Sequence, residues 1–272
     1  MELYRLIILI LLLIILFIVL FRVLFIASKL PIKRGFHSPF WYLNERTEST
    51  NGQKIPMVCI GDSITHGLVS VNYLDILAKR PQNARLEFIN AGINGDLAYN
   101  VIVRMDEIIQ CQPNYATILI GTNDVHRSFG PFNQRKSVWQ KHLSQIPTKA
   151  YYQECLEKII DRLQNETKAK IAVLSIPLIA ERPEEKAEKI AIEYNEIIRE
   201  VTQQKGVAYL PLHEKMVEFM KDRPIRQKKP FWMQVPTTIM VLIQHFGFGV
   251  SWEDFGSKQD RKSTRLNSSH GK

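Results

Sequence analysis

The sequence has few of the residues from which disulfide frameworks and metal sites are built. Its three cysteines, Cys59, Cys111 and Cys155, lie far apart in the chain of 272 residues, and none belongs to a C-x-x-C pair. The odd number disfavours a disulfide framework, and the missing pair argues against a zinc or dithiol redox site. We therefore expect three buried, inert thiols.

The chain also lacks internal repeats and any basic stripe with interleaved aromatic residues. Its formal net charge is +9, but Lys and Arg are scattered among acids outside the last thirteen residues. This pattern disfavours nucleic acid as a partner. Apolar residues make up 45% of the chain and charged residues 23%, which is typical of a globular protein with a substantial core.

An apolar run near the N-terminus predicts a membrane anchor. Residues 6–21 are all Leu, Ile, Val or Phe, and the run continues past Arg22 to Ala27, giving 22 residues. About 20 helical residues span a bilayer, whereas a signal peptide has an apolar region of about 7–15 residues and a small-residue cleavage site. We expect residues 1–27 to form an uncleaved transmembrane helix and thus a single-pass membrane localisation, with a signal peptide as the alternative.

The segment after this run has basic residues and loop-forming residues. Lys29, Lys33 and Arg34 follow the apolar run, which favours a cytoplasmic domain, although so few charges leave the side of the membrane open. Residues 28–54 contain several Pro, Gly and Asn residues, and we interpret them as a juxtamembrane linker. Its aromatic stretch at 40–43 either sits at the lipid interface or packs on the following domain.

Strand-like and helix-like segments alternate over the rest of the chain. The predicted strands are 54–61, 84–95, 114–124, 169–179 and 206–212, and the predicted helices are 97–110, 151–165, 184–204 and 213–222. This alternation predicts an α/β fold with a parallel sheet covered on both faces. Ligands bind at the carboxyl ends of the strands in such sheets. Residues 125–150 are interpreted as an insertion beside that crevice.

Three polar segments follow predicted strands and so meet at that crevice. They are Gly61-Asp62-Ser63, residues 90–96 and residues 121–124. A serine at a strand-to-helix turn presents its hydroxyl beside free helix N–H groups. An acyl-transfer enzyme needs such a nucleophile and donors aimed at the developing oxyanion. Gly95, which lacks Cβ, and the Asn123 side-chain amide are suitable further donors.

These segments resemble the GDSL/SGNH hydrolases in order, spacing and strand context. The matching motifs are GDSIT at 61–65, NAGINGD at 90–96 and GTND at 121–124, and the resemblance covers roughly residues 55–212. It implies a three-layer α/β/α sandwich with a parallel, flavodoxin-like sheet and the hydrolysis of esters. It further implies Ser63 as nucleophile and oxyanion donor, with Gly95 and Asn123 as the other donors. No metal or organic cofactor is implied.

Acids and histidines near these motifs are given structural roles. We expect Asp62 and Asp124 to brace their loops by accepting hydrogen bonds from the backbone. His66 and His126 are expected to be exposed loop histidines. Gly92 lies in the same loop as Gly95, but the position before Asp96 matches the family glycine better.

The general base of this family is missing from the sequence. By resemblance, base and acid come from one late D-x-x-H block, but no Asp of this chain stands three residues before a His. His213 precedes a helix without a suitable acid, and His245 has Asp254 only nine residues after it. We therefore expect a hydrolase domain over residues 55–259 that is incomplete and inactive as given.

Two late segments carry separate expectations. The tail at 260–272 can be back-translated into a common sequencing-library adapter, so we expect a non-native tail; an ordinary disordered basic tail is the alternative. The apolar and aromatic segment at 225–256 is interpreted as a helical cap over the crevice or as a lipid-touching face.

The sequence as a whole predicts a membrane-anchored serine hydrolase that cleaves carboxylic esters. The expected partners are an ester-containing small molecule, a lipid or an acylated glycan, and the membrane through the N-terminal helix. A noncatalytic lipid- or glycan-binding module and an O-acyltransferase on the same fold remain alternatives.

Overall fold

The structure, a computed structural model, describes residues 37–45, 54–68, 71–179 and 185–221, with Tyr4, Arg5, Leu11 and Ile14. The predicted cap at 225–256 and the tail at 260–272 lie outside the described residues.

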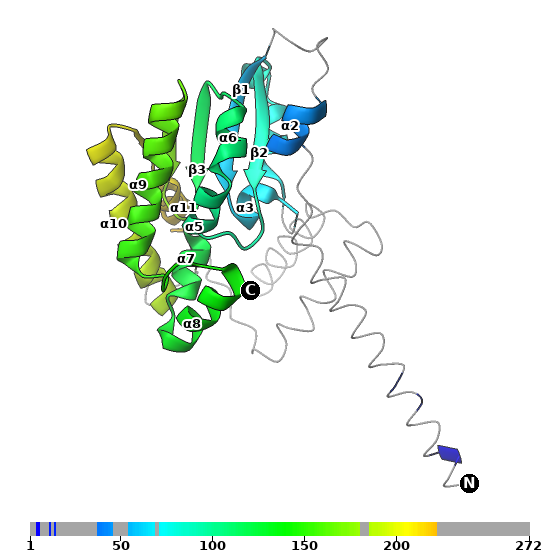
Figure 1. The fold of residues 1–272 in the computed structure, drawn as a ribbon, viewed down its shortest axis with the longest axis vertical. Helices are drawn as coiled ribbons and strands as arrows, with labels where there is room; N and C mark the ends of the chain where they lie inside the picture. Colours follow the sequence, from blue (N-terminus) through cyan, green and yellow to red (C-terminus); the bar gives the residue numbers. More distant parts are fainter. Residues whose placement is uncertain are drawn as a thin grey trace, which may run out of the picture.

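Within the described residues, a five-stranded parallel sheet forms the centre of the fold (Figure 1). Its strands are β1 (Ile55–Gly61), β2 (Leu86–Gly92), β3 (Tyr115–Leu119), β4 (Lys170–Leu174) and β5 (Ala208–Leu210). They lie in the order β2-β1-β3-β4-β5, and every neighbouring pair is parallel. This is the flavodoxin-like order. The predicted α/β fold with a parallel sheet is confirmed.

Helices cover the sheet because each parallel connection must cross it. The crossings are α3 (Ser63–His66) with α4 (Tyr73–Ala78), then α5 (Ala98–Val103) with α6 (Met105–Gln110), then α9 (Lys149–Glu166), and last α10 (Lys186–Lys205). The last three crossings step across the sheet in one direction, so right-handed connections place α5, α6, α9 and α10 on one face. Contacts of α9 with α5, α6 and α10 agree (Figure 1). The first crossing steps the opposite way, which places α3 and α4 on the other face.

The remaining helices lie around this framework. They are α2 (Pro39–Glu45), α7 (Thr122–Arg127), α8 (Gly130–Lys141), α11 (Leu212–Met220) and a 3₁₀ turn, η3 (Pro81–Asn83). The predicted insertion at 125–150 thus contains α8. Helix α2 lies in the predicted linker and contacts β2 and α6 (Figure 1). Its Tyr42 is buried, and Trp41 packs on the core, so of the two alternatives for this stretch the structure shows packing on the domain.

The sheet positions the polar strand ends because its strands are buried on both faces. Val58, Cys59 and Ile60 are consecutive and all buried, as expected of a central parallel strand. The three cysteines are free and buried, as predicted. One predicted helix is wrong in its continuity: the segment 97–110 breaks at Arg104, whose backbone (φ −113, ψ 16) is not helical.

The prediction of a transmembrane helix is corrected. Across the part of the chain that the structure describes, no helix has both the length and the apolar character needed to cross a membrane. The long described helices α9 and α10 are amphipathic, with one buried side and many charged residues on the other. The N-terminal transmembrane helix of the fold prediction and the single-pass membrane localisation are therefore withdrawn. Of residues 1–27, only Tyr4, Arg5, Leu11 and Ile14 are described.

Candidate active site

Ser63 is the first residue of the short helix α3, directly after β1. The Asp62 carboxylate caps this helix by accepting a hydrogen bond from the backbone N–H of Ile64 at 3.0 Å. Gly67 ends the helix with a left-handed backbone (φ 71). Ser63 itself is partly exposed. The turn thus places a serine hydroxyl at a helix N-terminus, where N–H groups are free.

Helix α3 sits close to the end of β2 because Gly92 has no side chain. A Cβ at Gly92 would collide with the backbone nitrogen of His66 and approach the carbonyl oxygen of Asp62 to 2.9 Å. The second motif therefore supports the first by permitting this close approach.

The second motif continues into a tight turn that contains Gly95. The Asp96 N–H donates to the carbonyl oxygen of Ile93 at 3.2 Å, and Gly95 has a φ of +75. A side chain is strained in this conformation. The turn leaves Gly95 partly exposed beside the Asp96 backbone, which is where the third motif makes contact.

Asn123, in the first turn of α7, links the three motifs. Its side-chain Nδ2 donates to the backbone oxygen of Asp96 at 2.9 Å and, through a longer contact of 3.4 Å, to the Asp62 carboxylate. The amide therefore lies between the residue that precedes Ser63 and the residue that follows Gly95. The structure brings the neighbourhoods of all three predicted site residues together at one edge of the sheet.

Asp124 braces the loops from within the core. Its carboxylate accepts from the backbone N–H of Ala98, at the start of α5, at 3.2 and 3.4 Å. Asp62 accepts from Ile64 in the same manner, so both acids have the backbone-bracing contacts that the sequence predicts. Both carboxylates are almost completely buried.

Burial raises the pKa values of the three acids of this site. The pKa of Asp62 rises to about 6, because burial outweighs the hydrogen bond from Ile64, and Asp96 raises it further. The pKa of Asp124 rises to about 7 by burial, against the hydrogen bond from Ala98. The pKa of Asp96 is also raised by burial, although the Arg104 guanidinium opposes the shift. These carboxyl groups are therefore harder to ionise than exposed ones.

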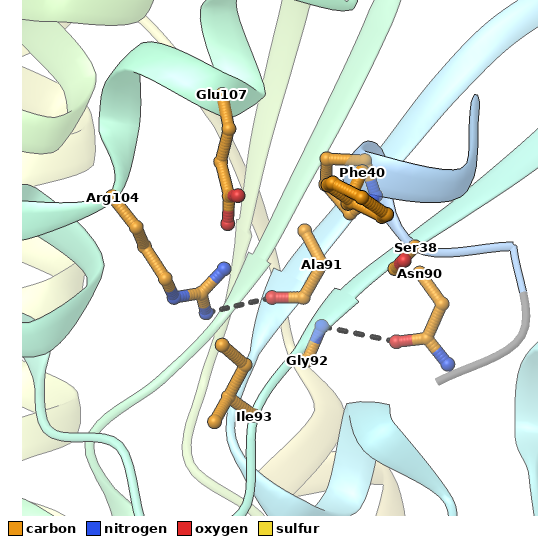
Figure 2. Close-up of a pocket in the computed structure, with 9 residues that line it drawn as sticks. Ser38, Phe40, Asn90, Ala91, Gly92, Ile93, Arg104 and Glu107 are labelled. Atoms are coloured by element: carbon orange, nitrogen blue, oxygen red, sulfur yellow. Dashed lines mark hydrogen bonds between the residues drawn. The ribbon is translucent and has the colours of Figure 1, made fainter. Parts of the chain in front are cut away.

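Arg104 supports the site and was not found from the sequence. Its Nε pairs with Asp96 at 2.9 Å, and its Nη2 donates to the carbonyl oxygens of Ala91 at 2.7 Å and Gly61 at 3.2 Å. Figure 2 shows the guanidinium directed at the end of β2. This arginine ties the ends of β1 and β2 to the Gly95 turn. The sequence signal was only a basic residue within a predicted amphipathic helix.

A small pocket lies beside this arginine, between α2 and the end of β2 (Figure 2). It is lined by Ser38, Pro39, Phe40, residues 90–93, Arg104 and Glu107. The lining does not include Ser63, Gly95 or Asn123. The pocket therefore shares the first residues of the second motif but is not lined by the three predicted site residues.

Three histidines differ from the prediction in part. His66 is buried, not exposed, and its Nδ1 lies 2.9 Å from Asn94 Oδ1. His126 is exposed, as predicted, but belongs to α7 rather than to a loop. His213 does face an acid: its Nε2 lies 3.4 Å from Glu188 of α10, and its backbone N–H donates to Ser175. His245 and Asp254 lie outside the described residues.

Among the described residues, no group of three or more His, Cys, Asp or Glu side chains is arranged to hold a metal ion. The arrangement that is present is a serine hydroxyl at a helix N-terminus, a partly exposed turn glycine and a side-chain amide. Such a set of groups suits attack on a carbonyl carbon with hydrogen-bond donors for the oxygen.

Comparison with known proteins agrees with this chemistry. The family model described as "GDSL-like Lipase/Acylhydrolase family" matches residues 59–229. No curated protein matches the chain in sequence.

Several solved structures share the fold. Axe2, an acetylxylan esterase from Geobacillus stearothermophilus, is 16% identical with a TM-score of 0.52, over 74% of this chain and 97% of its own. The acetyl xylan esterase AlAXEase is 20% identical with a TM-score of 0.50, over 61% and 81%. LAE5, an α/β hydrolase enzyme from the metagenome of Lake Arreo, Spain, is 20% identical with a TM-score of 0.51, over 62% and 81%. At these identities the likeness establishes the fold alone.

Proposed function

Since the chain belongs to the GDSL-like lipase/acylhydrolase family, we propose that its site is built to cleave carboxylic esters through Ser63. The Ser63 oxygen attacks the ester carbonyl, and the negative charge that develops on the carbonyl oxygen is held by three donors. These are the Ser63 N–H, the Gly95 N–H and the Asn123 amide. The ester C–O bond then breaks, and the alcohol leaves with the proton of the Ser63 hydroxyl, so that the acyl group stays on Ser63. Water hydrolyses this acyl group to the acid and returns a proton to Ser63.

The position of Asn123 is the observation that carries this proposal. Its Nδ2 is held at 2.9 Å by the Asp96 carbonyl oxygen, next to Gly95, and reaches toward Asp62, next to Ser63. The longer contact of 3.4 Å is weak by hydrogen-bond geometry. In our proposal, the N–H that makes this weaker contact donates instead to the substrate oxygen.

The substrate class that we favour is an O-acylated glycan with a small acyl group. Two of the solved structures that share the fold are described as acetyl xylan esterases. An acyl lipid is the other ester type compatible with the same chemistry. The common requirement is an ester carbonyl that reaches Ser63 at the carboxyl edge of the sheet.

The general base that such a serine needs is not recognisable in this sequence. No Asp in the sequence stands three residues before a His, and His213 is buried against Glu188 of α10. We therefore expect little ester turnover, limited to what oxyanion stabilisation and binding provide. The same observation favours a second candidate function, the noncatalytic binding of an acylated glycan or lipid.

An exogenous base separates the two candidates. Imidazole, added to the protein with 4-methylumbelliferyl acetate, is expected to increase ester hydrolysis above the rate of imidazole alone, because it accepts the Ser63 proton. The increment should disappear in Ser63→Ala. As a matched control we choose Ser144→Ala, which removes the hydroxyl of an exposed serine outside the three motifs that hydrogen bonds Tyr151. A Ser63→Ala protein with the full increment would refute Ser63 as the nucleophile, and no increment in any protein would favour the binding module.

A further inference from the structure

The ammonium group of Lys141 lies over Gly95. Lys141 is the last residue of α8, and it is partly buried. A Cβ built on Gly95 would lie 2.8 Å from Lys141 Nζ and 3.5 Å from its Cε. The missing side chain of Gly95 therefore leaves the space that the end of this lysine occupies.

Backbone contacts fix the position of Lys141 relative to the Gly95 turn. The Asn100 side chain donates to the Lys141 carbonyl oxygen at 3.3 Å, and its Oδ1 accepts from the backbone N–H of Leu97 at 3.1 Å. Asn100 thus joins the end of α8 to the residues that directly follow Gly95 and Asp96. These two hydrogen bonds of Asn100 hold the end of α8 close to the Gly95 turn.

Among the residues that the structure describes, no carboxylate is bound to the charge of Lys141. Within the described part of the chain, no ion pair or side-chain hydrogen bond of its Nζ is found, and the nearby Asp96 carboxylate is paired with Arg104 at 2.9 Å. Burial lowers the pKa of Lys141, the charge of Asp96 opposes this shift, and Arg127 adds to it. A partly buried cation with this environment gains free energy when an anion binds beside it.

We propose that Lys141 is the charged component of the oxyanion site, and that this site prefers an anionic oxygen to a neutral carbonyl of the same shape. The proposal rests on the proposed function, in which the Gly95 N–H faces the oxyanion. The ester carbonyl is neutral before attack and its oxygen is negative in the tetrahedral intermediate. A nearby ammonium therefore favours the intermediate over the bound ester.

A structural role for Lys141 is the competing explanation. Cations are favourable in the last turn of a helix because they interact with its dipole, and Lys141 is the basic residue of the last turn of α8. This role would change the stability of α8 but would give the site no preference for an anion. Binding measurements on one anion and its neutral analogue distinguish the two explanations.

The experiment compares acetate with acetamide. Both are titrated into the ¹⁵N-labelled protein, and binding is followed through the chemical shift of the Gly95 amide. We expect acetate to bind more tightly than acetamide, and Lys141→Met to weaken acetate binding about fivefold or more while leaving acetamide unchanged. Lys141→Arg, which keeps the charge, should retain part of the preference. Lys141→Gln provides a second neutral variant, and the amide spectrum of each variant reports whether it is folded.

Lys149→Met is the matched control. It removes the same charge from an exposed lysine that pairs with Glu193 at 2.7 Å, and it should leave acetate affinity within about twofold. The proposal is overturned if the unsubstituted protein binds acetate no better than acetamide, or if folded Lys141→Met keeps the preference. A preference that depends on Lys141, without any imidazole-dependent activity of Ser63, would leave the anion site standing and refute the proposed hydrolysis. The reverse result would refute the role of Lys141 alone.

Discussion

At the residue scale, the candidate site is held by side chains that bind backbone groups. Asp62 caps the helix that carries Ser63, Asp124 holds the start of α5, and Asn123 holds the Asp96 carbonyl oxygen. Each of these side chains is short and polar. Asp62 directly follows β1, and Asn123 and Asp124 lie in the first turn of α7, the helix after β3. Such residues satisfy the backbone groups that a strand-to-helix turn leaves free.

The cysteines give a residue-scale prediction of chemical reactivity. Burial raises the pKa of Cys59 to about 11 and the pKa values of Cys111 and Cys155 to about 12. The thiolate is the reactive form, so we expect almost no reaction of the native protein with Ellman's reagent at pH 8. The denatured protein should release three equivalents, since the chain has three cysteines. A thiol that reacts rapidly in the native protein would contradict the buried positions.

What could be predicted at this scale depended on how local the contact is. The backbone-bracing contact of Asp62 is local, because it joins residues two apart. For Asp124 the sequence predicted the bracing role but not the partner, because Ala98 is 26 residues away. Burial of His66 against Asn94 and the pairing of His213 with Glu188 join distant residues. Nothing in the residues around a histidine specifies such a partner, so the sequence could not predict them.

At the element scale, the boundaries depend on tertiary contacts more than on periodicity. The apolar spacing over 97–110 is helical throughout, yet the chain breaks at Arg104 into α5 and α6. The break allows the guanidinium to reach Gly61, Ala91 and Asp96. Helix α2 was likewise not predicted, because its seven residues lie within a segment rich in loop-forming residues.

Removal of this arginine should loosen both strand ends. Arg104→Met leaves the Asp96 carboxylate buried without its cation and removes one donor each from the carbonyl oxygens of Ala91 and Gly61. The Gly61 oxygen still accepts from the Ile93 N–H. Breaking a buried ion pair in this way costs about 3–5 kcal/mol, and we expect a loss of about 3 kcal/mol in the free energy of unfolding measured with urea. Arg162→Met, on the exposed face of α9, is the control and should cost less than about 1 kcal/mol. Equal effects of the two substitutions would contradict a supporting role for Arg104.

At the scale of the whole molecule, the sequence predicted the parallel sheet correctly, whereas its prediction of a transmembrane helix is corrected. Alternating strand and helix segments have few parallel arrangements once crossovers are short and right-handed, so the fold class followed from the pattern. The transmembrane prediction for residues 1–27 depended on the length of an apolar run alone. Helices α9 and α10 are amphipathic and contact the sheet, and none of the described helices is suited to cross a membrane.

The three buried acids give a prediction for the stability of the whole domain. The pKa values of Asp62 and Asp124 are raised to about 6 and about 7 in the folded protein, whereas an unfolded Asp has a pKa of about 3.9. Between these values the folded state binds more protons than the unfolded state. The contribution of these acids to the free energy of unfolding therefore falls as pH rises from about 4 to about 7, and stays low above that range.

The isosteric variant Asp124→Asn tests this sign. Its amide oxygen still accepts from the Ala98 N–H, but the side chain does not ionise. We expect the stability of Asp124→Asn relative to the unsubstituted protein to increase by about 2 kcal/mol from pH 5 to pH 8 in urea titrations, since each unit of pKa shift corresponds to about 1.4 kcal/mol. Asp75→Asn, at an exposed position of α4, should show no such trend. A relative stability of Asp124→Asn that is constant or decreasing with pH would mean that Asp124 ionises in the folded protein as readily as in the unfolded chain.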